Sequence, residues 1–277
     1  MTAMGVAAEQ IQLRIFQRMT PAERLDCCFR WTRLTCDLAR ATVRSAHPDW
    51  SPGRVSREVG RRLTGIDLSR LAPGEGADEA SGEPAAPEDR MTTPDEIPSL
   101  IARLEQVGAV YALTGSLASA AWGRPRATYD ADVLIDLSTA HVDRLLAAFP
   151  EPAWYADRRQ IKDALASGGE FNIIHGASGT KIDFWIKHSE ADAQRLARRR
   201  RERVAGVDCW LLSPEDTILA KLEWLAAAPS ERQKHDVAGV LAVQGDRLDM
   251  AYLTSWSDRL GVRALLDQAR AGAWDRA

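Results

Sequence analysis

The first part of the chain has apolar side chains at helical spacing over residues 8–70, with many arginines between them. Thr20-Pro21-Ala22-Glu23 is a capping box with proline at the first helical position, and it predicts where a helix begins. Its apolar residues fall on two stripes, Leu25, Phe29, Cys36 and Val43 on one and Trp31, Leu34 and Leu38 on the other. A second helix is expected from Ser51-Pro52 to a stop at Gly65.

Two or three helices over about 60 residues give only a marginal hydrophobic core. We therefore expect residues 1–70 to form a helical module of unknown role that packs on the rest of the chain or on a partner. Residues 71–96 are rich in Pro, Gly, Ala and Glu and predict a flexible acidic linker. Met91 is followed by a second capping box, Thr93 to Glu96, so we hypothesise that two once separate polypeptides are fused here.

From residue 97 onward, strand and helix patterns alternate as in a compact α/β domain, and a helical tail follows over about 213–272. Residues 110–113 form a short apolar strand that runs into Gly115-Ser116, and a small-residue helical turn follows. A glycine-serine turn that opens a helix presents backbone N–H groups and a hydroxyl, which suit a phosphate. Residues 132–136 predict the next strand.

Two carboxylates stand at the start of that strand, in Asp130-Ala131-Asp132. Side chains at i and i+2 of a strand share one face, so these acids repel each other unless a hard divalent cation such as magnesium lies between them. Residues 170–175 and 180–187 predict a hairpin whose second strand offers Asp183 as a third carboxylate. We interpret Asp136 as a strand-end residue, and Arg126 and Thr128 as groups that brace the acidic loop.

The composition narrows the class of protein. The formal net charge of -3 gives no global argument for nucleic-acid binding, and no stretch is apolar enough to cross a bilayer. The four cysteines lack metal-ligand spacing and fit reduced, buried thiols, so a cytoplasmic protein is expected. The basic run 198–203 is tempting as an RNA-contact surface, but we favour a solvated helix end.

The ordered set Gly115-Ser116, Asp130-Ala-Asp132 and Asp183 resembles the nucleotidyltransferase superfamily related to polymerase β. More narrowly, it is similar to small bacterial nucleotidyltransferases that include abortive-infection and toxin–antitoxin enzymes. In the tail, Lys221 and Asp236 match the lysine and the later acid of that pattern. The resemblance covers about residues 97–270 and implies a mixed α/β sheet flanked by helices.

The resemblance also implies roles for these residues. Asp130 and Asp132 would hold magnesium, with Asp183 binding a second ion or activating the acceptor hydroxyl. Gly115 and Ser116 would receive the β- and γ-phosphates of a nucleoside triphosphate, and Lys221 would contact the triphosphate or organise the site. The acceptor would be RNA (transfer RNA included), a protein side chain or a small molecule such as an aminoglycoside, and a toxin-like role fits the narrower family.

Two other functions remain open from the sequence alone. The chain would be a binding module if the N-terminal helices were an antitoxin-like cover and the second domain served only in complex formation or regulation. It would be a hydrolase if the same acids transferred the nucleotide to water. Either way, the N-terminal helices are candidates for contact with a partner, and no membrane contact is expected.

Overall fold

The structure is a computed structural model that describes residues 3–65, 96–176 and 179–274. Over these residues a seven-stranded sheet has the order β3-β4-β5-β2-β1-β7-β6. The strands are β1 (Val110–Leu113), β2 (Asp130–Asp136), β3 (Trp154–Ala156), β4 (Glu170–His175), β5 (Lys181–Ile186), β6 (Arg200–Val204) and β7 (Val207–Leu211). The linker expected at 71–96 and its capping box lie outside the described residues, apart from Glu96, the first residue of α4.

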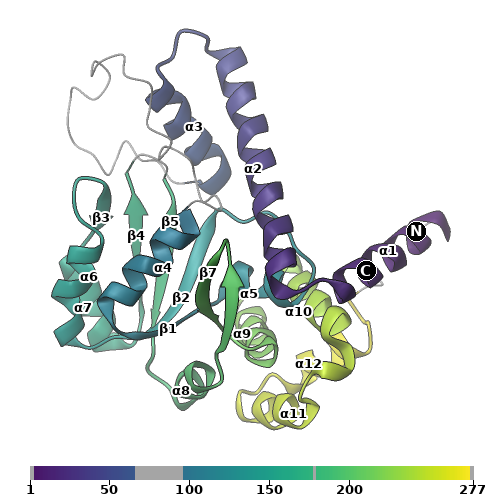
Figure 1. The fold of residues 1–277 in the computed structure, drawn as a ribbon. Coiled ribbons are helices and arrows are strands. Elements are labelled where there is room, and N and C mark those ends of the chain that lie inside the picture. The colour runs from purple at the N-terminus through teal and green to yellow at the C-terminus, as the bar shows by residue number, and fades with distance from the viewer. Residues whose placement is uncertain (1–2, 66–95, 177–178, 275–277) are drawn as a thin grey trace.

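Helices surround the sheet and extend beyond one side of it (Figure 1). They are α1 (Ala3–Arg18), α2 (Pro21–Ala46), α3 (Pro52–Thr64), α4 (Glu96–Val107), α5 (Gly115–Trp122), α6 (Val142–Ala148), α7 (Arg158–Ser167), α8 (Glu190–Ala197), α9 (Pro214–Ala227), α10 (Glu231–Gln244), α11 (Met250–Arg259) and α12 (Arg263–Arg270). The predicted mixed α/β fold with a helical C-terminal part is confirmed.

The middle of the sheet determines which side chains meet at the site. Strand β2 pairs antiparallel with β1 and parallel with β5, and β5 forms the predicted antiparallel hairpin with β4. One face of β2 is apolar, because Val133 and Ile135 are buried in the main core together with Leu104 of α4. The alternation of a strand then places Asp130, Asp132 and Leu134 on the opposite face.

The N-terminal helices are joined to this core. The capping box of Thr20 and Glu23 is present at the start of α2, and α2 packs against α5 and the edge strand β6. Leu25, Cys28 and Phe29 of α2 belong to the same buried cluster as the sheet. Helix α3, which ends at Gly65 as predicted, folds back on α2 and lies beside the end of the sheet (Figure 1).

The second apolar stripe of α2 is exposed, whereas the first is buried. Trp31, Leu34 and Leu38 are exposed.

All four cysteines are free, and Cys28, Cys36 and Cys209 are buried, as expected for reduced thiols. Among the described helices, none combines the length and apolarity that a membrane span requires.

The expectation for the basic run was wrong over most of its length. Helix α8 ends at Ala197 and Arg198 is its C-cap residue, but residues 200–204 form the edge strand β6. Most of the run is therefore extended rather than helical. Strand β6 pairs with β7 in a hairpin that turns at Ala205 and Gly206, both of which have positive φ. Arg201 and Arg203 form ion pairs with Asp208 across this hairpin.

Candidate active site

The turn from β1 into α5 brings a glycine against an acidic side chain. Gly115 has φ of +57°, a conformation in which a side chain is strained. A Cβ atom built on Gly115 would lie 1.8 Å from Oδ2 of Asp132, closer than any real contact. The position therefore requires glycine for two reasons, its backbone conformation and the carboxylate that fills the space beside it.

The three predicted acids come from adjacent strands and share one face. Asp132 is the direct partner of Asp183 in the parallel register of β2 and β5, and Asp130 precedes Asp132 by two residues. Burial, reinforced by the negative charges of Asp130 and Asp183, raises the pKa of Asp132 to about 6. Burial also raises the pKa of Asp183. The strands thus hold an excess of negative charge in one place.

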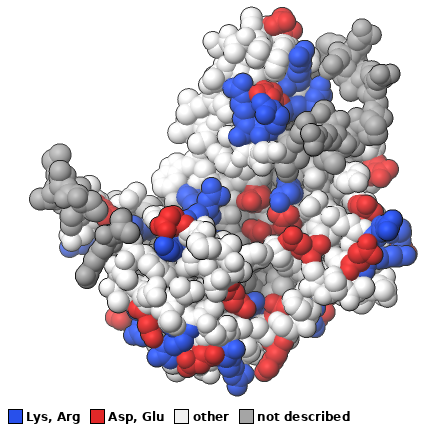
Figure 2. Space-filling view, turned by 180° about the vertical axis from the view of Figure 1, so that it is seen from behind, with Lys and Arg blue, Asp and Glu red and all other residues white. Residues whose placement is uncertain are grey.

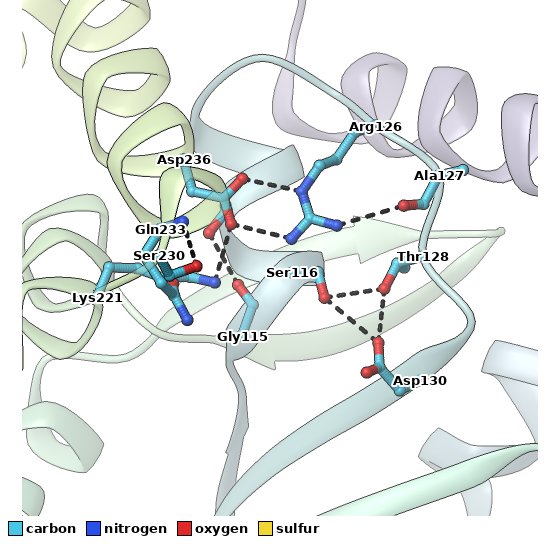
Figure 3. A network of polar contacts seen from close by, with 11 residues as sticks. Gly115, Ser116, Arg126, Ala127, Thr128, Asp130, Lys221, Ser230, Gln233 and Asp236 are labelled. Atoms are coloured by element: carbon cyan, nitrogen blue, oxygen red, sulfur yellow. Dashed lines mark hydrogen bonds and ion pairs between the residues drawn. The ribbon is translucent and has the colours of Figure 1, made fainter. Parts of the chain in front are cut away.

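Hydroxyl groups hold Asp130 at the start of β2. The Thr128 hydroxyl lies 2.7 Å from Oδ1 of Asp130, and the Ser116 hydroxyl lies 3.4 Å from the same oxygen (Figure 3). The Thr128 hydroxyl also forms a hydrogen bond with the Ser116 hydroxyl at 2.8 Å, so the glycine-serine turn and the acidic strand are connected directly. Thr128 braces the acidic loop as predicted.

Lys181 is the residue that the sequence interpretation missed. Its Nζ lies 2.7 Å from Oδ2 of Asp183, and it comes from the same face of β5. In the part of the chain that the structure describes, no three His, Cys, Asp or Glu side chains are grouped closely enough to hold a metal ion. The carboxylate donors and their mutual repulsion fit a hard divalent cation, but Lys181 would have to release Asp183 for all three to act as ligands.

A buried ion-pair group lies on the other side of the turn. Lys221 of α9 donates to Oδ2 of Asp236 at 2.9 Å, and Arg126 binds both oxygens of the same carboxylate at 2.9 and 3.0 Å (Figure 3). Burial opposes ionisation of Asp236, yet its pKa is lowered because Arg126 and Lys221 stabilise the carboxylate. Asp236 supports Lys221 from the next helix, as expected, and Arg126 braces this group rather than the acids of β2.

These groups open into a cleft of about 650 Å³. Its walls include the turn residues Gly115 and Ser116 and the acids Asp130 and Asp132, together with Lys221. Asp183 is not one of the lining residues, and its carboxylate is paired with Lys181. Figure 2 shows acidic and basic side chains close together in the hollowed middle of this face. Asp136 lies away from the cleft wall and pairs with Lys187 at 2.6 Å, as a strand-end residue does.

A second cavity, of about 350 Å³, adjoins Asp130 on the side of the N-terminal helices. Leu63 and Thr64, at the end of α3, line it together with Asp130 and Lys181. Arg126 and Arg232 line both cavities, so the two spaces meet near Asp130. Nothing in the sequence indicates this approach of α3 to the acids, because the two segments are far apart along the chain.

Comparison with known proteins gives two findings. Residues 17–91 match the family model described as Rv0078B-related antitoxin. Among solved structures, an antigenic nucleotidyltransferase-like protein from Paracoccidioides brasiliensis matches with 16% identity and a TM-score of 0.36, over 65% of this chain and 93% of that chain. No curated protein matches the chain. The antitoxin match covers α2 and α3 and ends at Met91, where the sequence suggests the start of a second polypeptide.

Proposed function

We propose that residues 97–270 form a metal-dependent nucleotidyltransferase that transfers a nucleoside monophosphate from a nucleoside triphosphate to an acceptor hydroxyl. The observation that carries the proposal is the register of Asp132 with Asp183, in which Asp132 lies against Gly115 and lines an open cleft. Clustered acids raise one another's pKa and are costly to bury without a cationic ligand. The arrangement therefore suits a function that brings in positive charge.

In this proposal Asp130, Asp132 and Asp183 would hold magnesium, which supplies neutralisation of the phosphate charge. Gly115 and Ser116 line the cleft at the start of α5, and their backbone N–H groups and the Ser116 hydroxyl would receive the β- and γ-phosphates. Lys221 and Arg126 add positive charge nearby, while Asp236 fixes their positions. The protein's contribution is thus positioning and charge neutralisation.

The bond changes are those of an in-line substitution at phosphorus. The acceptor oxygen forms a bond to the α-phosphorus as the bond to the bridging oxygen breaks, and pyrophosphate leaves with that electron pair. The acceptor's proton has to be taken by a base in the site. Asp183 is the candidate where it does not itself bind an ion, because burial raises its pKa and so strengthens it as a base.

The test is incubation of the full chain with magnesium and each α-labelled nucleoside triphosphate in the presence of total cellular RNA, protein and metabolites. We expect label to be attached to one of these acceptor classes. Asp130→Asn and Asp132→Asn should each stay folded and lose at least about a hundredfold in rate, since several kcal/mol of transition-state stabilisation are removed. Asp136→Asn is the matched control on the same strand and should keep full activity.

Two outcomes would change this picture. Normal transfer by Asp130→Asn or Asp132→Asn would remove the assignment of the acids. Release of labelled nucleoside monophosphate, with no label on any acceptor, would identify a hydrolase that uses the same residues.

A second function is favoured for the N-terminal helices. We propose that they are a fused antitoxin-like cover that restricts the approach of the acceptor to a toxin-like transferase. The antitoxin match supports this, and so does the position of Leu63 and Thr64 in the wall of the cavity next to Asp130. A small cavity that is closed on one side by α3 leaves room for a short group but hinders a large one.

Substitutions at Leu63 test the cover in the full chain. Leu63→Ala widens the cavity and should raise the rate of transfer, whereas Leu63→Trp fills it and should lower the rate. Nucleotide affinity, measured by calorimetry, should be unchanged in both. Arg62→Ala, on the exposed side of the same helix, is the control. Equal rates in all three proteins would reject the cover.

Deletion of residues 1–90 is the more drastic test. If the cover inhibits, the remaining chain should show higher turnover or toxicity. The shortened chain has to fold with α5 and β6 exposed, because Leu25 and Phe29, which are buried in the shared core, are removed with α2. The fusion hypothesis predicts that residues 91–277 nevertheless fold, and insoluble product would argue against it.

A further inference from the structure

One end of the cleft is aromatic. Trp185 and Trp224 meet edge to face with their ring centroids 4.8 Å apart, and both line the cleft that contains Asp130 and Asp132. Trp224 is 47% exposed, which is unusual for so large an apolar side chain. An exposed aromatic ring inside a cleft, rather than on an open surface, indicates a place where a flat apolar group can be bound.

The strand register places this aromatic end next to the acids. Trp185 follows Asp183 by two residues on the same face of β5, and its direct partner on β2 is Leu134. Two residues along a strand correspond to about 7 Å. Asp132 and Trp185 both line the cleft, so its aromatic end adjoins its acidic end.

Along helix α9, as along β5, a charged residue is followed by a tryptophan. Lys221 lies at the polar end, and Trp224, three residues later, lies at the aromatic end. The apolar residues Leu134, Ile186, Leu212, Ala220 and Ala227 line the same cleft, and so do the polar residues Glu170, His188, Asp192, Arg195 and Glu223. The acids and hydroxyls thus lie at one end of the cleft, and at the other end the two tryptophans add aromatic surface to a wall of mixed polarity.

A nucleoside triphosphate has the same division, with phosphates at one end and a flat base at the other. We propose that Trp224 and Trp185 form the nucleobase site of the cleft, with the base lying against the exposed ring of Trp224. This assignment rests on the proposed function and adds the residues that bind the nucleoside. Because every base has an aromatic face, stacking provides affinity with little preference between bases.

Calorimetry with the full chain in the presence of magnesium tests the site. The probes are each nucleoside triphosphate and inorganic tripolyphosphate, which has the charge but no base. Trp224→Ala should weaken binding of the nucleoside triphosphate by about tenfold, which corresponds to about 1.4 kcal/mol, and leave tripolyphosphate binding unchanged. Trp224→Phe should retain most of the affinity. Trp31→Ala, which removes an exposed tryptophan from α2, is the matched control.

The outcomes separate this inference from the function on which it rests. If the unaltered protein binds nucleoside triphosphates and Trp224→Ala binds them equally well, the nucleobase site is wrong and the transferase proposal stands. Equal weakening for tripolyphosphate would also overturn the site, because Trp224 would then be acting on the phosphate end. If the unaltered protein binds no nucleoside triphosphate, the proposed function fails and the site fails with it.

Discussion

Thr32 of α2 and Thr128 form a buried contact between segments that are 96 residues apart. The backbone N–H of Thr128 donates to the Thr32 hydroxyl at 3.1 Å, and the Thr128 carbonyl lies 3.2 Å from the same hydroxyl. The side chain of Thr128 in turn holds Asp130. Helix α2 is therefore connected to the first acid of the site through a single residue.

Replacing Thr32 with valine keeps the shape and removes the hydroxyl. The Thr128 N–H is then buried without a partner, which costs about 1–3 kcal/mol of unfolding free energy. We expect transfer activity to fall as well, because the segment that positions Asp130 can relax. Urea denaturation and the labelled-nucleotide assay measure the two effects.

Two variants control for this prediction. Thr32→Ser keeps the hydroxyl and should retain both stability and activity. Thr42→Val removes an exposed hydroxyl on the same helix, one that bonds only locally to the carbonyl of Leu38, and should be nearly neutral. A Thr32→Val protein as stable and active as the unaltered chain would show that the contact has no role.

The sequence predicted the central strands and the acids because their signals are local. Alternation along β2 and β5 determines which side chains share a face. Parallel pairing of β2 with β5 is not local, and the sequence patterns did not predict its direction. The ion pair of Lys181 with Asp183 could have been anticipated from their spacing of two residues on one strand face.

Other parts of the site had no sequence signal. The contact of Thr32 with Thr128 and the approach of Leu63 to Asp130 depend on how α2 and α3 dock, and that in turn depends on the complementary shape of two buried surfaces. The exposed Trp224 looks like a core residue in the sequence, because its exposure depends on a cleft formed by several strands and helices.

Gly115→Ala tests the fit between the glycine turn and Asp132. The added methyl group would overlap the carboxylate, so Asp132 has to move and activity should fall by at least about a hundredfold. Gly261→Ala is the matched control, since Gly261 also has a positive φ (+69°) but nothing within 4 Å of the added atom. Both variants should lose roughly 1 kcal/mol through backbone strain. Retained activity in Gly115→Ala would contradict the assigned geometry.

The raised pKa of Asp132 predicts how stability depends on pH in protein kept free of metal by a chelator. Because the folded state raises this pKa from 3.8 to about 6, folding favours the protonated form, and the penalty is complete above pH 6 and disappears as the pH falls toward 4. Asp132→Asn removes the penalty. The variant should therefore be more stable than the unaltered protein at pH 7.5, by on the order of 1–3 kcal/mol.

The measurement for Asp132 is the difference in unfolding free energy between the two proteins at several pH values. Taking the difference cancels the contributions of titrating groups that do not interact with Asp132. The advantage of the variant should shrink as the pH is lowered from 7 to 4. A difference that does not vary with pH would mean that folding does not raise the pKa of Asp132.

The ion-pair group of Asp236 predicts unequal effects for its members. Asp236→Asn leaves the buried Lys221 and the partly buried Arg126 without their counter-charge, and it should cost about 3 kcal/mol of unfolding free energy. Lys221→Met should cost much less, because Arg126 still binds both oxygens of Asp236 and the methionine retains the apolar stem.

Nucleotide binding should show a different order, because Lys221 would contact the triphosphate directly. Lys221→Met should lose about tenfold or more in affinity for nucleoside triphosphate and for tripolyphosphate alike, since a charged contact is removed from the phosphate end. Lys234→Met, which removes a cation paired with Glu231 on the neighbouring helix, is the control and should change neither property. If Lys221→Met bound both ligands normally, the lysine would be a structural partner of Asp236 alone, and the phosphates would have to be held by the α5 turn and Arg126.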